Sequence, residues 1–304
     1  MYVNIDIHHI LLCKLFNIQG LNTQMQFNFT KMHGLGNDFV VINCISQSVH
    51  LNTEEIQFIA NRHLGIGCDQ LLLVENTNDK DADFCYRIFN ANGEEVEQCG
   101  NGARCFAIFV RDEGLTHKTE IPVITNTGRI VLKIEDEGEN NNQVTVNMGI
   151  PELRPEKIPF IADRQCESYT LDIGGKTVIF SAVSIGNPHA VILVNDVETE
   201  VIEGLAQAIQ QSSYFPNSVN VGFMQIIDQN NIKLRVYERG VGETQACGTG
   251  ACAAVVAGRI QGLLENTVKT ELQGGNLSIH WAGEQNPVMM TGATATVFKG
   301  TISL

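Results

Sequence analysis

The sequence lacks the cysteine spacing of a metal ribbon or a dithiol redox enzyme. Its nine cysteines are scattered along 304 residues and no Cys-X-X-Cys pair occurs, so neither a zinc ribbon nor a thioredoxin-type motif is expected. An odd number of dispersed cysteines is typical of free thiols in a reducing compartment. We therefore expect a cytoplasmic protein without a metal site.

The sequence also lacks an excess of positive charge and a long hydrophobic run. The formal net charge is −14, which argues against nucleic acid or an anionic membrane surface as a partner. The most apolar N-terminal run, at 8–16, is short and is interrupted by Lys14, so it predicts neither a membrane span nor a secretory signal. A hydrophobic fraction of 43% and a charged fraction of 18% indicate a folded protein. A soluble enzyme that acts on a small molecule is the expectation.

The first 26 residues differ from the rest of the chain. They carry no glycine-punctuated strand pattern, and a second methionine, Met25, stands just before the segment FNFTKMHGLGNDF. We interpret 1–26 as an extension outside the folded core. An ordered N-terminal arm is the alternative, although terminal segments are often disordered.

Strand-like runs dominate the remaining sequence and are separated by Gly, Asn and Asp, as turns require. They are expected at 39–44, 70–75, 84–89, 122–126, 129–134, 143–148, 177–183, 189–194 and 232–238. Helical patterns are fewer, at 53–63, 103–113, 203–212 and 250–264. This arrangement predicts α+β sheets that each wrap a helix rather than a doubly wound parallel sheet. The length favours two domains.

The two halves of the chain repeat each other in order. Asn37 and Gln70 are followed 150 residues later by Asn187 and Asn220, whereas Asn90 and Cys99 are followed 148 residues later by Glu238 and Cys247. Four pairs at a nearly constant offset indicate two homologous domains. A pseudo-twofold relation between these domains would place both cysteines at one cleft, where small-molecule sites commonly form.

Each of these cysteines opens the pattern Cys-Gly-X-Gly-Ala, at 99–103 and 247–251, and a helical pattern follows each. The cysteine is therefore expected just before a helix N-terminus, where unpaired N–H groups and the helix dipole lower a thiol pKa. We expect a thiol pKa near neutrality. The glycines allow close backbone approach, so N–H groups of Gly100, Asn101, Gly248 and Thr249 could hold a carboxylate.

Two thiols on opposite walls could invert a stereocentre. One thiolate would remove a Cα proton from one face while the other thiol delivers a proton to the opposite face. A carboxylate held at two helix N-termini would stabilise the developing carbanion. A tight turn with a buried cysteine is the structural alternative for one such motif, and the duplication favours catalysis.

The chain resembles the diaminopimelate epimerase family. The matching motifs are KMHGLGNDF (31–39), GCDQLLLVE (67–75), FNANG and VEQCGNGARC (89–105), IGNPHAV (185–191), VNVGF (219–223), and YERGVGET with ACGTGACA (237–253). The resemblance implies two similar pseudo-twofold-related domains, each a mainly antiparallel sheet around a central helix. It places them at 27–143 with 293–304, and at 144–292. It also implies conversion of LL-2,6-diaminopimelate to the meso form without PLP or a metal, by a homodimer.

The resemblance also assigns roles to residues of this sequence. Cys247 would accept the proton and Cys99 would donate it in the direction from LL to meso, while Gly100, Asn101, Gly248 and Thr249 would hold the reacting carboxylate. The residues expected to hold the rest of the substrate are Asn37, Gln70, Asn90, Asn187, Asn220, Glu238 and Arg239. His189 and Glu238 would modulate the pKa of the cysteines.

Other interpretations of the same residues stay open. Gly-Asn and Asn-Gly pairs form turns, His189 could be a core histidine, and Glu238 with Arg239 could be a surface ion pair. Six of the other seven cysteines, at 44, 68, 85, 105, 166 and 252, are expected to be small buried hydrophobic residues. A racemase of proline-like amino acids and a binding protein with a Cys99–Cys247 redox disulfide are the rival functions.

Overall fold

The computed structural model describes residues 25–96, 99–126, 128–135, 142–173, 175–199 and 201–304. Almost all of the predicted extension at 1–26 therefore lies outside the described residues. In the described part of the chain, no helix combines the length and the apolar character that crossing a membrane would need.

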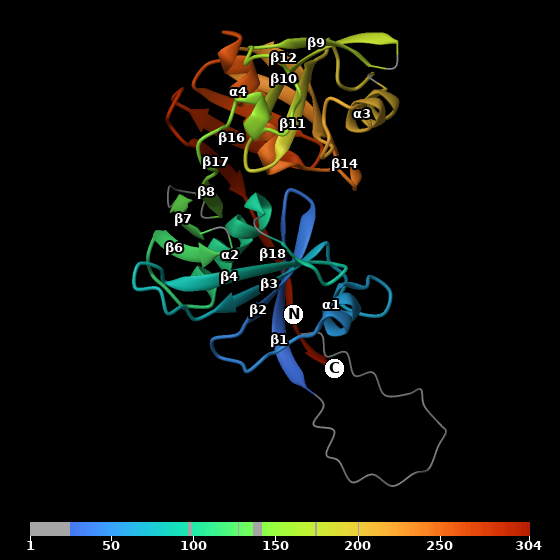
Figure 1. The fold of residues 1–304 in the computed structure, drawn as a ribbon. Helices are drawn as coiled ribbons and strands as arrows, with labels where there is room; N and C mark the ends of the chain where they lie inside the picture. Colours follow the sequence, from blue (N-terminus) through green and yellow to red (C-terminus); the bar gives the residue numbers. More distant parts are fainter. Residues whose placement is uncertain (1–24, 97–98, 127, 136–141, 174, 200) are drawn as a thin grey trace, which may run out of the picture.

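The first half of the molecule is a sheet with one helix on each side of it (Figure 1). Its strands and helices are β1 (Gln26–Gly34), β2 (Asn37–Asn43), α1 (Thr53–Ala60), β3 (Gln70–Glu75), β4 (Phe84–Asn90), β5 (Glu95–Val96), α2 (Gly100–Asp112), β6 (Glu120–Thr125), β7 (Gly128–Glu135) and β8 (Gln143–Asn147).

The second half repeats this order of elements. It contains η2 (Pro155–Lys157), β9 (Tyr169–Ile173), β10 (Lys176–Ser184), β11 (Pro188–Leu193), α3 (Ile202–Gln210), β12 (Asn220–Asp228), β13 (Asn231–Glu238), β14 (Gly242–Thr244), α4 (Gly248–Ile260), β15 (Thr267–Leu272), β16 (Gly275–Trp281) and β17 (Val288–Ala293). The last strand, β18 (Ala295–Ser303), returns to the first half, where it lies antiparallel to β1 (Figure 1).

Strand pairing is the same in both halves. Strands β2 and β3 are parallel, as are β11 and β12, and the pairs β4–β6 and β13–β15 are parallel as well. The other pairs are antiparallel in each half, and β8 pairs with β17 to join the two halves. The predicted α+β fold of two homologous, mainly antiparallel domains is therefore confirmed.

The central helices α2 and α4 are the most buried elements. Ten consecutive residues of α2, Asn101 to Val110, and nine of α4, Gly250 to Gly258, are buried, and both helices belong to one continuous core. The shorter helices α1 and α3 pack on smaller apolar clusters elsewhere in each half. Because packing on all sides fixes α2 and α4, their N-termini are held rigidly.

The predicted helices are all present, but their bounds differ. Helices α2 and α4 begin at Gly100 and Gly248 rather than at 103 and 250, because tertiary packing overrides the poor helix propensity of glycine. Strands β1, β5, β9, β12 and β14–β18 were not predicted from the sequence. Several of these strands alternate exposed polar with buried apolar residues, as β15 does, and so lack the apolar runs on which the other predictions were based.

Candidate active site

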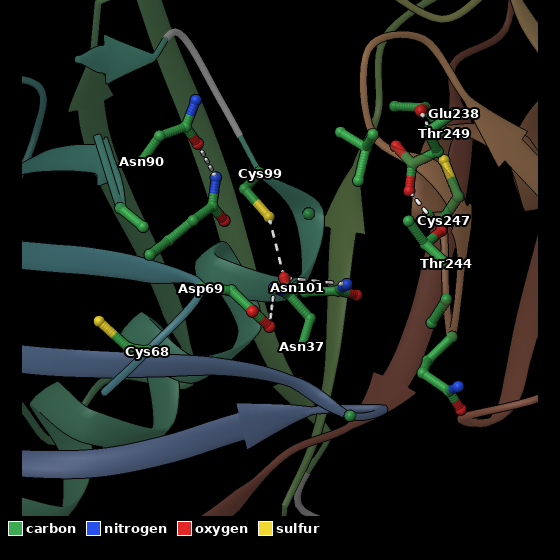
Figure 2. A pocket seen from close by; sticks show the side chains of 18 of the residues that line it. Asn37, Cys68, Asp69, Asn90, Cys99, Asn101, Glu238, Thr244, Cys247 and Thr249 are labelled. Atoms are coloured by element: carbon green, nitrogen blue, oxygen red, sulfur yellow. Dashed lines mark hydrogen bonds between the residues drawn. The ribbon is translucent and has the colours of Figure 1, made fainter. Parts of the chain in front are cut away.

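A cavity of about 710 Å³ lies between the two halves and carries both cysteine motifs on its walls. Figure 2 shows Asn37, Asn90 and Cys99 on one side of the cavity and Glu238 and Cys247 on the other. Both cysteines are free thiols in the structure. The predicted meeting of the two motifs at one site is therefore observed.

Cys99 is the N-cap of α2, with an extended backbone. The N–H groups of Gly102 and Asn101 point at its sulfur. The Cys99 thiol also donates to Asn37 Oδ1, at 3.7 Å, and the same oxygen accepts from Asn101 Nδ2 at 3.4 Å. Cys99 therefore sits at the helix N-terminus that the sequence predicted, between backbone donors and one amide oxygen.

Cys247 is the N-cap of α4 in the same extended conformation. Its sulfur lies 3.6 Å from Thr249 Oγ1, and the N–H of Gly250 points at it. The Glu238 carboxylate lies beside this thiol and is held by Thr244 Oγ1, which donates to Glu238 Oε1 at 2.6 Å. The second thiol therefore has a carboxylate as its close neighbour.

One side chain touches the N-termini of both helices. A Cβ atom added at Gly100 would lie 2.6 Å from Met290 Cε, and one added at Gly248 would lie 3.0 Å from Met290 Sδ. The two N-termini thus converge within the length of one methionine side chain. A side chain at either position would require Met290 to move, and glycine avoids this contact.

The pKa values of the two thiols correct the sequence prediction. Burial raises the pKa of Cys99, and the N–H groups of Gly102 and Asn101 together with the Arg104 charge offset this only in part. Burial raises the pKa of Cys247 well above its usual value, and the Glu238 charge raises it further. The helix N-termini act in the predicted direction, but desolvation of a buried thiolate outweighs them.

Most of the predicted binding residues line the cavity. The lining includes Asn37, Gln70, Asn90, Gly100, Asn101, Asn187, Glu238, Gly248 and Thr249. Gln70 Nε2 donates to Asn90 Oδ1 at 2.9 Å, which joins the ends of the neighbouring strands β3 and β4. The interpretation of these residues as turn formers alone does not explain why they gather at one cavity.

Three predicted residues are not among those that line the cavity. His189 is 1% exposed, and its Nε2 lies 3.0 Å from Asn187 Oδ1. Asn220 is buried, and its Oδ1 accepts from the Arg239 N–H at 2.9 Å. The Arg239 guanidinium is exposed and donates to the Asn217 carbonyl at 2.7 Å. Their roles stay predictions. No ion pair joins Glu238 to Arg239 among the described residues, which contradicts the surface-pair interpretation.

Burial and, to a smaller extent, the Arg239 charge lower the pKa of His189 to about 3. The imidazole is therefore neutral at neutral pH and has no positive charge with which to act on a thiol. Of the other cysteines, Cys105, Cys252 and Cys68 are buried as predicted. Cys44, Cys85 and Cys166 are only half-buried, which corrects the prediction for these three.

Asp69 and Arg62 line the cavity without having been predicted. Asp69 Oδ2 accepts from Asn37 Nδ2 at 3.1 Å, and Arg62 donates to both Asp69 and Asp38. This network turns the oxygen of the Asn37 amide toward Cys99. The position of Asp69 beside Gln70, at the start of a strand, is the signal that could have indicated it.

Comparison with known proteins agrees with this site. The sequence model of the diaminopimelate epimerase family matches residues 29–154 and 181–297. The chain is 57% identical over 282 residues to the diaminopimelate epimerase of Thioalkalivibrio sulfidiphilus (strain HL-EbGR7), covering 92% of this chain and 100% of that protein. It is 53% identical over 280 residues to the diaminopimelate epimerase of Teredinibacter turnerae (strain ATCC 39867 / T7901), with coverage of 92% and 100%.

Solved structures share the fold at low sequence identity. A phenazine biosynthesis protein of the PhzF family from Bacillus anthracis aligns with a TM-score of 0.65 at 16% identity, covering 92% of this chain and 100% of that one. A hydroxyproline epimerase from Agrobacterium vitis, solved with bound trans-4-hydroxy-L-proline, aligns with a TM-score of 0.65 at 14% identity, covering 92% and 93%.

The duplicated fold and the paired cysteine motifs, together with the names of these relatives, define an isomerase of the racemase and epimerase class. Within that class the sequence match extends over both halves of the chain and most of its length. The chain belongs to the diaminopimelate epimerase family.

Proposed function

We propose that this protein converts LL-2,6-diaminopimelate to meso-diaminopimelate by two-base chemistry, as a step in lysine and peptidoglycan-precursor biosynthesis. One observation carries the proposal: Cys99 and Cys247 each cap a fully packed helix, and both line one cavity between duplicated halves. The names of relatives more than 50% identical over nearly the whole chain support diaminopimelate as the substrate.

In the proposed reaction the Cys247 thiolate takes the Cα proton from one face of the LL isomer, and the C–H electron pair stays on carbon. The Cys99 thiol then gives its proton to the opposite face and becomes a thiolate. The reverse reaction exchanges these roles. N–H groups of Gly100, Asn101, Gly248 and Thr249 would hold the α-carboxylate, and the convergence of both helix N-termini on Met290 supports this. Such donors stabilise charge that develops in the transition state.

The remaining binding residues are proposed for the far end of the substrate. Asn37, Gln70, Asn90 and Asn187 line the cavity with Glu238. Asn220 and Arg239 are proposed to complete the site when the substrate binds. Glu238 is proposed to modulate the pKa of the cysteines through its charge, and His189, which is neutral, by holding Asn187 at the cavity. A site for a proline-like amino acid would not need this set of amide side chains.

We further propose that the reaction uses neither PLP nor a metal. In the proposed reaction the backbone N–H groups at the two helix N-termini stabilise the carbanion in place of an electron sink. PLP is held as a lysine Schiff base, and none of the described residues that line the cavity is a lysine. Among the residues that the structure describes, no three His, Cys, Asp or Glu side chains gather as a metal site requires.

Three features of the chain as a whole remain proposals. The domains are proposed to be 27–143 with 293–304, and 144–292, preceded by an extension at 1–26. The proposed boundary at 143/144 falls at the start of β8, which pairs with β7 of the first half and with β17 of the second. We also propose that the protein is cytoplasmic and that it forms a homodimer. Sedimentation of the purified protein would test the homodimer.

The proposed function is tested by solvent-deuterium exchange. The purified protein is incubated in D₂O with LL-diaminopimelate under reducing conditions, once with added EDTA and once with no addition, and PLP is omitted throughout. Deuterium at one Cα and formation of the meso isomer are expected in both. L-Proline is the control substrate. The absence of exchange with diaminopimelate, or exchange with proline alone, would overturn the proposal.

A further inference from the structure

Arg104 is the largest fully buried side chain of the described residues, with 0% exposure. It lies in the first turns of α2, five residues after Cys99. In the described part of the chain no carboxylate pairs with it, and its Nε is buried without a hydrogen-bond partner. Arginine keeps its charge in proteins, and a buried cation without a counter-ion is strongly unfavourable. An unpaired buried charge of this kind therefore calls for a functional explanation.

The contacts of Arg104 lead to the first thiol. Its Nη2 donates to Asn101 Oδ1 at 2.7 Å, which leaves Asn101 Nδ2 to donate to Asn37 Oδ1. That oxygen accepts from the Cys99 thiol. The other terminal nitrogen of Arg104, Nη1, lies 3.5 Å from the Gly100 carbonyl and 3.8 Å from Met290 Sδ. Arg104 thus fixes the side chain of Asn101, whose backbone N–H faces the Cys99 sulfur.

The titratable groups that interact with the Arg104 charge are thiols. Burial lowers the pKa of Arg104, while Cys105, Cys99 and Cys252 act in the opposite direction. Among the described residues, the titratable groups that interact with Cys99 besides Arg104 are Tyr86, whose hydroxyl donates to the Cys99 carbonyl at 3.4 Å, Cys105 and, across the cavity, Glu238. Arg104 is the positive member of this set. The second motif has Cys252 at the equivalent position, 148 residues later.

We infer that Arg104 is a positioning residue of the first cysteine motif, which orders Cys99 through Asn101 and Asn37 and whose charge favours the Cys99 thiolate. In the direction from LL to meso this thiolate forms when Cys99 gives up its proton; in the reverse direction it is the base. This catalytic consequence rests on the proposed function. The charge effect on Cys99 itself does not, and it can be measured without substrate.

The test measures alkylation of the full chain by iodoacetamide as a function of pH, with mass spectrometry of the peptides that contain Cys99 and Cys247. In Arg104→Met, alkylation of Cys99 below its pKa is expected to slow about tenfold, while Cys247 is expected to keep its rate within about twofold. Arg104→Lys retains the charge and should recover most of the rate. Arg111→Met, two turns further along α2, is the matched control and should leave Cys99 unchanged. Equal Cys99 profiles in wild type and Arg104→Met would overturn the inference.

A purely structural role for Arg104 makes a different prediction. Because Arg104→Met removes an unpaired buried charge, its unfolding temperature is expected to equal or exceed that of wild type, whereas a structural arginine would lower it. Asn101→Asp is a second variant of nearly the same shape that supplies Arg104 with a carboxylate. It should slow Cys99 alkylation in the same direction, and an unchanged rate would contradict the inference even if Arg104→Met failed to fold.

Turnover separates this inference from the proposed function. If the chain is an epimerase, kcat/KM of Arg104→Met should fall about tenfold, and by the same factor from LL and from meso substrate, because the equilibrium between them is unchanged. If wild type shows no epimerisation but Arg104→Met still slows Cys99 alkylation, the proposed function fails and the inference about Cys99 stands. If wild type turns over and both readouts of Arg104→Met equal those of wild type, the inference alone fails.

Discussion

In the first half of the molecule Arg87 donates through Nε and Nη2 to the two oxygens of Glu95, at 2.9 and 2.8 Å. In the second half Arg235 makes the same pair with Glu243, at 2.6 and 3.0 Å, and both residues stand 148 positions later. The bidentate arginine–glutamate pair on the strand before each cysteine has thus been retained after duplication.

The groups beside the thiols have diverged by comparison. The first thiol has Arg104 behind it, where the second half has Cys252, and the second thiol has Glu238 beside it, where the first half has Asn90. Phe39 and His189 also stand at equivalent positions of the two halves, and both are buried. The duplicated backbone places two thiols alike, and opposite local charges make them unequal. In the proposed reaction these charges favour a thiolate at Cys99 and a thiol at Cys247, which is the state that would take the proton from the meso isomer.

The largest expected effect is the loss of either thiol. Cys99→Ala and Cys247→Ala should each reduce epimerisation by about 10³-fold, within the range that general acid–base groups contribute. For each variant, kcat/KM is measured from the LL isomer and from the meso isomer, and deuterium exchange at Cα is followed separately. Cys105→Ala, a buried cysteine of the same helix, is the control and should retain activity. Loss of activity in only one of the two variants would show that the two halves do not share the chemistry.

The next largest effect concerns His189, which stands where the first half has Phe39. The pKa of His189 is about 3 when folded and about 6.5 when unfolded, so between these values the unfolded chain binds more protons. The free energy of unfolding should therefore fall as the pH falls below 6.5, by about 2 kcal/mol at pH 5. In His189→Gln, whose amide can replace the bond to Asn187, this part of the pH dependence should disappear. The measurement is urea unfolding at pH 7 and pH 5.

His63→Gln removes an exposed histidine from the first half and serves as the control. It should keep the wild-type difference between pH 7 and pH 5. An equal loss of stability on acidification in wild type and His189→Gln would show that the buried imidazole does not carry the acid sensitivity of the second half.

A smaller effect is expected for the carboxylate beside the second thiol. Because the Glu238 charge raises the pKa of Cys247, Glu238→Gln should lower it, and iodoacetamide should alkylate Cys247 about tenfold faster below that pKa. Glu243→Gln removes a charge from the same cavity wall, away from the thiol, and is the control. If both variants behave alike, the effect belongs to the net charge of the cavity and not to Glu238.

The sequence was sufficient for the fold class and for the pairing of the two motifs because both depend on the repeat. The constant offset indicated the duplication, and the glycines after Cys99 and Cys247 indicated the helix N-termini. The raised thiol pKa could not be predicted, because the degree of burial is a property of tertiary packing. The burial of Arg104 could not be predicted either, because arginine is common in helices. Nor could the contact of the Arg239 guanidinium with the Asn217 carbonyl, which also depends on tertiary packing.

The smallest expected effect concerns Gly102 and Gly250, which each stand three residues after the cysteine of their motif. An added Cβ at Gly102 would lie 2.7 Å from the Tyr86 hydroxyl, and one at Gly250 would lie 2.9 Å from Val236 Cγ2. Overpacking a core costs roughly 1–3 kcal/mol, while Gly to Ala in a helix gains about 1 kcal/mol. Gly102→Ala should therefore destabilise by about 1 kcal/mol and Gly250→Ala by somewhat less, since its contact is looser. Gly204→Ala in α3, with no atom within 4 Å of the new Cβ, should be stabilised. Urea unfolding at pH 7 measures all three. If Gly102→Ala proves more stable than Gly250→Ala, Tyr86 gives way to the new methyl group, and the core behind Cys99 is less tightly packed than the core behind Cys247.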